Sequence, residues 1–257
     1  MVLGQLELNK LYHSDCFDLM SLIPDKYIDC IIGDLPYSLT ECFWESDIPL
    51  DKFWVEVERI IKDNGVIVLT GVQPFTSDLV VSNKKLFKYS AVWEKTKVTD
   101  FAQCNGKFLN KHEDILVFSK GGCSSNAKNK IKYYPQGLIL YEQSIKRTDG
   151  GDTSDHRPGR TERTVNYTSR FTNYPTTILK FASEGNTFHA TQKPVKLFEY
   201  LIKSFTLKGD IVFDPTMGSG TTAIAAMNTK RRWLGSEKDE TIYVKAKLRI
   251  KKHFFHS

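Results

Sequence analysis

The chain has 257 residues, of which 40% are hydrophobic, and this is enough for the core of one large domain or of a domain with an insertion. Its five cysteines include no C-x-x-C pair, which argues against a disulfide framework and a structural zinc site, and we predict no bound metal. No apolar run reaches transmembrane length and the start lacks a signal-peptide pattern, so we expect a cytoplasmic protein without membrane contact.

Charge is distributed unevenly along the chain. Residues 1–119 hold 12 basic and 18 acidic side chains, residues 120–180 hold 11 and 5, and residues 181–257 hold 13 and 7. The formal net charge of +6 therefore comes from the second half of the chain. A basic excess of this kind favours an anionic partner such as nucleic acid.

The hydrophobic pattern of the first half predicts the alternating strands and helices of a doubly wound α/β sheet. A short strand ends before Asp15, which is placed to cap the helix that follows. A fully apolar strand then ends at Asp34. We predict strands at residues 11–13, 28–33, 66–69, 89–93 and 115–118 and helices at 17–22 and 50–62, with a mobile loop near the site between the last two strands.

The string Asp34-Leu35-Pro36-Tyr37 lies just past the carboxyl end of a buried strand, where open α/β sheets bind their ligands. Pro36 stiffens the turn and biases Leu35 to extended backbone, so that the Leu35 carbonyl has a fixed direction. A carboxylate, a carbonyl and an aromatic ring are what an extruded nucleobase with an exocyclic amine requires: two acceptors for the amino hydrogens and a ring for stacking.

Residues 120–180 differ from the rest of the chain in composition and in the absence of a regular hydrophobic pattern. Glycine and serine pairs break any long periodicity, and Arg157, Arg160, Arg163 and Arg170 recur without an apolar stripe. Aromatic residues are interleaved with these basic side chains, as suits contact with phosphates and bases. We expect an insertion here rather than core; a solvated basic loop with a small subcore is the alternative.

A second strand-turn-helix pattern follows near the C-terminus. An apolar strand at 210–213 leads through a glycine-rich turn with Gly218 and Gly220 into a helix of small residues at 222–227. Glycines in this position let main-chain N–H groups point at an anionic ligand group at the helix N-terminus. The next strand ends at Glu237, where an acid can accept hydrogen bonds from ribose hydroxyls. This pattern fits an adenosyl-type ligand, and a terminal helix is predicted at 245–253.

These motifs together resemble the permuted, beta-class DNA amino-methyltransferases, the N6-adenine/N4-cytosine DNA methylase family, in which the catalytic tetrapeptide precedes the cofactor site. The blocks at 112–118, 173–176 and 189–195 are similar to further family segments, and the order of all five is the family order. The resemblance implies a Rossmann-like, mostly parallel seven-stranded sheet with helices on both faces. It divides the chain into a catalytic half (1–119), a target-recognition insertion (120–180) and a cofactor-binding half (181–257).

The resemblance further implies S-adenosylmethionine as cofactor, double-stranded DNA as partner, base flipping, and a prokaryotic or phage-encoded enzyme of restriction-modification type. Whether the chain forms a homodimer, and whether a cognate restriction endonuclease accompanies it, stays open. The implied catalytic residues are Asp34, Leu35, Pro36 and Tyr37. The implied cofactor-binding residues are Asp15, Cys16, Asp34, Gln192, Lys193, Pro194, Asp214, Pro215, Thr216, Gly218, Ser219, Gly220, Thr221, Thr222, Glu237 and Lys238.

The tetrapeptide departs from the family in one residue, because Leu35 stands where the family usually has proline. Pro36 still restrains the Leu35 backbone, so we expect activity to survive. Asp34 at the first position accompanies adenine in the family, and we expect transfer to the N6 of adenine in DNA. The alternatives are an N4-cytosine enzyme, a protein that binds cofactor and DNA without turnover, and an enzyme acting on RNA.

Overall fold

The protein is described by a computed structural model that covers residues 2–3, 6–36, 48–148, 166–185, 187–188 and 192–256. The chain divides into two compact units. The larger unit comprises Met1–Tyr134 and Thr177–Ser257, and the smaller unit is Pro135–Thr176. Each is described below by itself.

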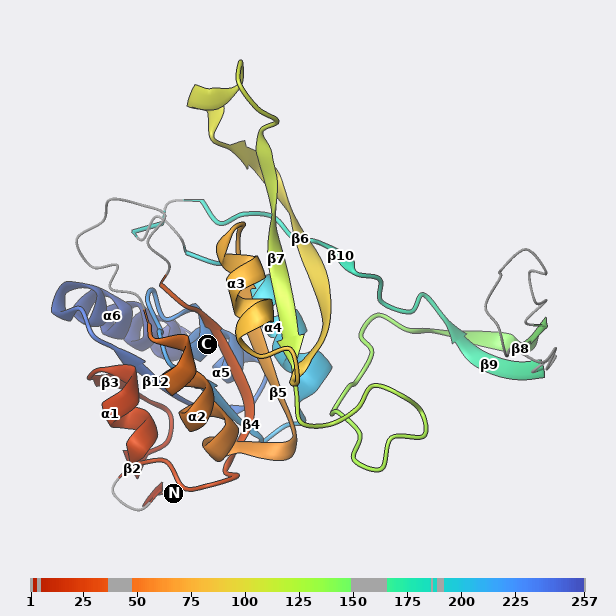
Figure 1. Cartoon of the computed structure of the whole chain (residues 1–257), viewed down its shortest axis with the longest axis horizontal. Helices are drawn as coiled ribbons and strands as arrows, with labels where there is room; N and C mark the ends of the chain where they lie inside the picture. Colours follow the sequence, from red (N-terminus) through yellow and green to blue (C-terminus); the bar gives the residue numbers. More distant parts are fainter. Residues whose placement is uncertain are drawn as a thin grey trace. The chain divides into compact units, whose positions relative to one another are not determined.

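The larger unit is built on an eight-stranded mixed sheet with the strand order β10-β6-β7-β5-β4-β11-β12-β3 (Figure 1). Only β7 among these described strands runs antiparallel to its neighbours, and every other pairing is parallel. The sheet strands are β3 (Lys10–His13), β4 (Ile28–Asp34), β5 (Ile61–Gly71), β6 (Phe87–Thr99), β7 (Asn110–Phe118), β10 (Ile178–Lys180), β11 (Ile211–Asp214) and β12 (Arg232–Glu237); the short strands β1 (Val2–Leu3) and β2 (Leu6–Glu7) pair with each other.

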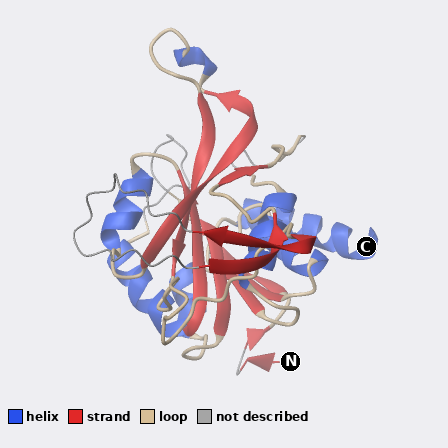
Figure 2. Cartoon of the chain, turned by 90° about the vertical axis from the view of Figure 1, so that its right-hand side faces the viewer, coloured by secondary structure: helices blue, strands red, loops and turns tan. Residues whose placement is uncertain are grey.

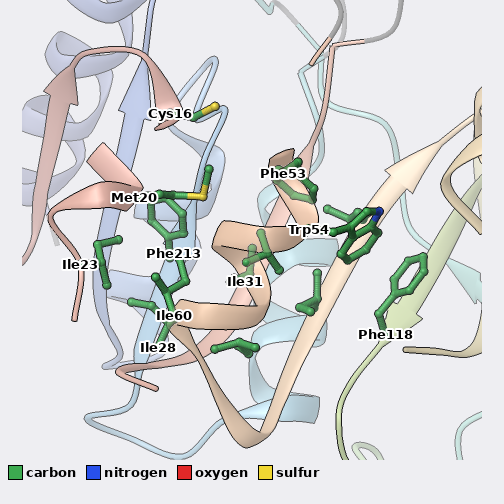
Figure 3. Close-up of a cluster of buried hydrophobic side chains, with 14 of the residues drawn as sticks. Cys16, Met20, Ile23, Ile28, Ile31, Phe53, Trp54, Ile60, Phe118 and Phe213 are labelled. Atoms are coloured by element: carbon green, nitrogen blue, oxygen red, sulfur yellow. The ribbon is translucent and has the colours of Figure 1, made fainter. Parts of the chain in front are cut away.

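Helices cover both faces of this sheet (Figure 2), because the central strands are apolar on both sides. Along β4, Ile31 joins the core cluster shared with α1, α2 and α3, whereas Cys30 and Ile32 join the cluster shared with α4, α5 and α6. Figure 3 shows the first cluster, where Met20 of α1 and Phe213 of β11 lie among the labelled side chains. The helices are α1 (Cys16–Ser21), α2 (Leu50–Ile60), α3 (Phe75–Ser82), α4 (Val195–Phe205), α5 (Thr221–Asn228) and α6 (Glu240–His256).

The mostly parallel α/β class predicted from the sequence is thus confirmed. The described sheet has eight strands where the family resemblance implied seven, because the short β10 pairs in parallel with the outer edge of β6. None of the described helices is both long and apolar enough to span a membrane.

The prediction of a mobile loop between the strands at 89–93 and 115–118 is wrong in part. Strands β6 and β7 continue well beyond these bounds as a long antiparallel hairpin, whose outermost pair is Thr99 with Asn110. A 3-10 turn, η1 (Phe101–Gln103), begins the connection at the tip. The sequence did not indicate the extra pairing because most of these residues are polar and they show no apolar alternation.

The smaller unit is a two-stranded antiparallel hairpin of β8 (Ile139–Thr148) and β9 (Asn166–Thr172) with its flanking segments. The Nδ2 group of Asn173 donates a hydrogen bond of 2.7 Å to the Gly137 carbonyl at the base of this hairpin. The unit lies within the range 120–180 predicted as an insertion, and its function in target recognition stays a prediction. Arg157, Arg160 and Arg163 lie outside the described residues.

A buried carboxylate joins two central strands of the larger unit. Asp29, which is 1% exposed, accepts hydrogen bonds from the Ile211 N–H of β11 at 3.0 Å and from the ammonium groups of Lys62 and Lys132 at 2.7 Å each. Burial alone would raise the pKa of Asp29, but the hydrogen bonds from Lys132 and Lys62 outweigh it and lower that pKa.

We predict that Asp29→Asn lowers the free energy of unfolding at neutral pH by about 3 kcal/mol, because two lysines lose a buried anion. A carboxyl whose pKa is depressed in the folded state stabilises above its unfolded pKa and loses that effect as pH falls through the folded value. The difference in free energy of unfolding between variant and wild type should therefore become smaller below about pH 4. Urea denaturation at several pH values measures it. Asp25→Asn, at the exposed ion pair with Arg59, is the control and should cost under about 1 kcal/mol.

Candidate functional site

Four neighbouring parallel strands bring acidic residues to the end of the sheet at which their carboxyl ends lie. Asp34 ends β4, Asp214 ends β11, Glu237 ends β12, and Asp15 follows β3. The strands pair in the order β4-β11-β12-β3, so these carboxylates form a row at the carboxyl ends. A row of this kind suits a cationic ligand in the crevice beyond the strand ends.

Asp34 is held at three points by residues of three other segments. Its Oδ1 accepts a hydrogen bond of 2.6 Å from the hydroxyl of Thr70 at the end of β5, and its Oδ2 one of 2.5 Å from the ammonium of Lys193. Its backbone carbonyl accepts a hydrogen bond of 3.0 Å from the hydroxyl of Thr216. The carboxylate is thus fixed in position while its side chain keeps 20% of its surface exposed.

Lys193 belongs to a chain of four charged side chains. Its ammonium lies 3.2 Å from Oε2 of Glu113 on β7, and the other oxygen of Glu113 pairs with Lys95 of β6 at 2.7 Å. The Lys193 side chain is only 5% exposed. Burial alone would raise the pKa of Glu113, but the ammonium groups of Lys193 and Lys95 lower it. Two cations and two anions therefore balance at the site.

The residues after Asp34 differ in environment. Leu35 is 1% exposed and packs into the hydrophobic core with α1 and α2. This burial gives the leucine that replaces the family proline a packing function. Pro36 is partly buried. Tyr37, predicted to stack on the base, lies outside the described residues, as does His189.

The glycine-rich turn after β11 has the predicted backbone. Gly218 has φ of +53° and Gly220, which precedes α5, has φ of +82°, the left-handed region that favours glycine. Buried Asp214 accepts hydrogen bonds from the Thr216 N–H at 3.0 Å and from the Thr222 hydroxyl. Burial raises the pKa of Asp214 to about 7, and the nearby carboxylates of Asp34 and Glu237 add to that increase.

The two acids at the far end of the row have backbone partners. Glu237 accepts hydrogen bonds of 2.9 Å from the N–H groups of Gly218 and Asp239, and burial raises its pKa. Asp15 caps α1 by accepting from the Phe17 N–H at 2.9 Å, as predicted for an N-cap. Lys238 lies 3.6 Å from the Asp15 carboxylate as an exposed ion pair.

Two further predicted residues lie inside the fold. The Cys16 thiol is buried in the core, and burial raises its pKa to about 12, so it is no thiolate nucleophile. Pro215 offers its carbonyl to the Ser236 hydroxyl at 2.7 Å and thereby fixes the turn against β12.

The 192–194 segment and the glycine turn are tied together by a network that the sequence did not indicate. Glu184 accepts hydrogen bonds from the Gln192 amide and from the Val195 N–H at the start of α4, the latter at 2.8 Å, next to Pro194. Arg249 of α6 pairs with Glu184 at 3.1 Å and also donates to the Ser219 carbonyl and the Thr221 hydroxyl at 3.0 Å each. The Thr221 hydroxyl in turn donates to the Lys193 carbonyl at 3.1 Å.

Some polar atoms at this end of the sheet have no partner among the described residues. They are the Ser14 hydroxyl, at the end of β3, and the amide oxygen Oε1 of Gln192, both buried. Because a buried polar atom costs free energy unless it is hydrogen-bonded, these atoms are sites where a polar ligand can bind.

Four residues of the site were missed by sequence reasoning: Thr70, Glu113, Glu184 and Arg249. Thr70 ends an apolar strand, the same signal that identified Asp34, although a threonine there is less conspicuous than a carboxylate. Glu113 stood in a block singled out only for its strand. Nothing in the sequence marks Glu184 and Arg249, which are 65 residues apart and meet only through the packing of α6.

We predict that Asp214 makes the free energy of unfolding depend on pH between about 4 and 7. A carboxyl whose folded pKa is raised binds its proton more tightly in the folded state, so its contribution declines as pH rises from the unfolded value of 3.8 to about 7. The decline amounts to at most about 4 kcal/mol. Asp214→Asn should flatten this part of the stability profile.

Chemical denaturation of both proteins from pH 4 to 8 measures the two slopes. Asp78→Asn, at an exposed position on α3, is the control and should keep the wild-type slope. An unchanged slope in Asp214→Asn would contradict the assignment of this group.

Comparison with known proteins places this site in a family. A family model described as "DNA methylase", the N6/N4 methylase family, matches residues 28–248. The type II methyltransferase M1.MboII of Moraxella bovis is 25% identical over 250 residues, covering 90% of this chain and 92% of that protein. M.HinfI of Haemophilus influenzae is 27% identical over 271 residues, covering 95% and 68%.

Solved structures show the same fold. A complex of M1.HpyAVI with SAM superposes with a TM-score of 0.62 at 21% identity, covering 94% of this chain and 98% of that one. The cytosine-N4-specific PvuII DNA methyltransferase superposes with a TM-score of 0.64 at 15% identity, covering 96% and 90%. Since the family model spans most of the chain, from β4 into α6, the chain belongs to the N6-adenine/N4-cytosine family of S-adenosylmethionine-dependent DNA amino-methyltransferases.

Proposed function

We propose that this protein transfers a methyl group from S-adenosylmethionine to the N6 amino group of adenine in double-stranded DNA. The observation that carries the proposal is the Asp34 carboxylate, fixed at the end of β4 by Thr70 and Lys193 and still partly exposed. A fixed acceptor of this kind is what an exocyclic amine needs in order to be oriented for attack.

The residues at the strand ends fit the cofactor. Its ammonium and sulfonium cations match the row of carboxylates. Its hydroxyl and amino groups match the Ser14 hydroxyl and the Gln192 amide oxygen, which have no hydrogen-bond partner in the described part of the chain. Asp15, Glu237 and the turn at 218–222 would hold it, together with residues 192–194. When bound, S-adenosylmethionine supplies an electrophilic methyl group.

The protein's own contribution is orientation rather than covalent catalysis. Among the described residues, Oδ1 of Asp34 accepts a hydrogen bond from Thr70 and Oδ2 accepts one from Lys193. A carboxylate oxygen has two lone pairs, so the carboxylate and the Leu35 carbonyl can accept the two amino hydrogens. Tyr37 would stack on the flipped base. No thiolate is needed, in keeping with Cys16 and Cys30, whose pKa values burial raises.

The N4 amine of cytosine is the second candidate substrate. An N4 amine offers the same two hydrogens, and the fold is shared with the cytosine-N4-specific PvuII enzyme, so fold alone does not separate the bases. The aspartate at the first position of the tetrapeptide supports adenine, because in the resembling family serine accompanies cytosine.

The smaller unit supports contact with DNA by its surface. Its hairpin exposes Ile139, Leu140, Tyr141 and Phe171. Exposed aromatic and aliphatic side chains beside the basic residues of this range suit contact with bases and phosphates. We propose that this unit reads the recognition sequence.

We expect Asp34→Ala to lower turnover at least about 1,000-fold, because the amine loses its charged acceptor. Nucleoside mass spectrometry of DNA incubated with methyl-labelled S-adenosylmethionine measures the product. Labelled N6-methyladenine from the wild type, absent with the variant, supports the proposal. Labelled N4-methylcytosine would instead identify cytosine, the second candidate, as the substrate. Undiminished labelling by Asp34→Ala would contradict the function assigned to this residue.

We expect Lys193→Met to lower the turnover number at least about tenfold while changing the cofactor dissociation constant less than about threefold, since its ammonium contacts Asp34 and Glu113. Calorimetric titration and steady-state kinetics separate the two quantities. Lys196→Met, at an exposed position in the first turn of α4, is the matched control. A large loss of cofactor affinity with an unchanged turnover number would instead assign Lys193 to the cofactor.

A further inference from the structure

The hairpin of β6 and β7 carries an arm, residues 95–111, that projects beyond the rest of the sheet (Figures 1 and 2). Its register relates it to the site. Asp34 pairs with Thr70, and Thr70 pairs with Ile115 of β7. Phe108 precedes Ile115 by seven residues, so at about 3.3 Å per strand residue it lies roughly 20 Å along the strand direction from the level of Asp34.

The arm begins at the end of the sheet that carries the row of carboxylates. Strand β6 runs parallel to β4 and β5, so its carboxyl end continues past the level of Asp34. Lys95, the first residue of the arm, belongs to the charged chain that leads through Glu113 and Lys193 to Asp34. The arm is therefore a direct extension of the site.

Two phenylalanines at the tip have no part in any core. Phe108 is 100% exposed and Phe101 is 72% exposed, whereas Phe118, further along β7, is fully buried. Exposing an aromatic side chain completely sacrifices the free energy that its burial would give. In a tip that does not need these rings for folding, they are available for a partner.

The tip is nevertheless ordered by its own hydrogen bonds. The N–H groups of Gln103 and Gly106 donate to the carbonyls of Asp100 and Gln103 at 2.8 and 2.9 Å. Lys107 pairs with Asp100 at 2.8 Å, and Asp100 has φ of +64°. A tip with a defined backbone presents its side chains without a large loss of entropy on binding.

The charge of the arm indicates the class of partner. Residues 95–111 contain four lysines and a single acidic residue, Asp100, so their formal charges sum to +3. Lys107 pairs with Asp100 inside the arm, and Lys95 and Lys111 pair with Glu113 and Glu94 next to it. A basic arm with aromatic rings at its end suits a polyanion with stacked bases more than an apolar protein surface. The reach of the arm from the level of Asp34, roughly 20 Å, exceeds the widths of the DNA grooves, which are about 6 Å and 12 Å.

We propose that the arm binds the DNA duplex and that Phe108 inserts between base pairs next to the target base, stabilising the duplex from which that base is extruded. The inference rests on the proposed function, because an amino-methyltransferase must take its base out of the stack. Apolar side chains that wedge into a base step are a known way to offset the free energy of unstacking.

The test compares Phe108→Ala with wild type on two duplexes that contain the methylated sequence, as mapped first with the wild-type enzyme. In one duplex the target base is paired normally, and in the other it lies opposite an abasic site, where extrusion is already easy. Single-turnover methylation should slow about tenfold or more on the paired duplex and stay within about threefold of wild type on the abasic one.

Phe255→Ala is the matched control, because Phe255 is 70% exposed on α6, and α6 contacts β12 and β3 at the other end of the sheet order. It should leave both rates unchanged, and Phe108→Trp should restore most of the rate on the paired duplex. Cofactor affinity and thermal stability should be the same in all variants.

Equal rates for Phe108→Ala and wild type, or equal slowing on both duplexes, would overturn the wedge. Self-association of the wild type in sedimentation, lost in Phe108→Ala, would assign the tip to a second copy of the chain instead and would also overturn it. A wild type that methylates no DNA would refute the proposed function itself, and that result is distinct from any change at Phe108.

Discussion

The ammonium of Lys193 between Asp34 and Glu113 is the interaction on which the organisation of the site depends. Without a cation between them, two carboxylates in a largely buried cluster would repel each other, and one would take up a proton. Lys193 comes from the segment before α4, so β4, β7 and the second half of the chain are connected at this one atom. A carboxylate that is meant to accept an amine must be present as a fixed anion, and this cluster supplies both the charge balance and the fixed geometry.

Repulsion between carboxylates also matters along the row of acidic residues at the strand ends. Parallel pairing places Asp34, Asp214 and Glu237 on consecutive strands, where burial, with a smaller addition from the charges of Asp34 and Glu237, raises the pKa of Asp214 to about 7. Such a row is unfavourable for the empty protein and favourable once a cation binds there. The strain is tolerated because backbone N–H groups and hydroxyls, such as those of Gly218 and Thr222, donate to the carboxylates. Stability and ligand affinity therefore oppose each other at this end of the sheet, as is common at functional sites.

Sequence reasoning located the strands that end in Asp34 and Asp214 because each is a short apolar run followed by a polar residue and a turn former. The glycine turn was likewise predicted from the sequence pattern, because Gly218 and Gly220 stand between an apolar strand and a helix of small residues. The long hairpin at 95–111 was not predicted, because pairing between polar, exposed strands leaves no periodic apolar signal. Similarly, the link between Glu184 and Arg249 depends on how α6 packs on α5, which no local pattern encodes. Local chemistry was predictable, whereas contacts between charged side chains distant in sequence required the tertiary structure.

Lys193 shows that a motif can predict where a segment lies in the fold without predicting what its side chain contacts. The family resemblance assigned the segment 192–194 to the cofactor. In the structure the Lys193 ammonium contacts Asp34, while the Lys193 carbonyl accepts a hydrogen bond from Thr221 of the glycine turn. One residue thus contacts Asp34, the carboxylate proposed to orient the substrate, through its side chain, and the turn proposed to bind the cofactor through its backbone. A shift of the turn on cofactor binding would move the Lys193 backbone and alter the ion pair at Asp34. Lys193 therefore couples the two halves of the site, although its motif suggested contact with the cofactor half alone.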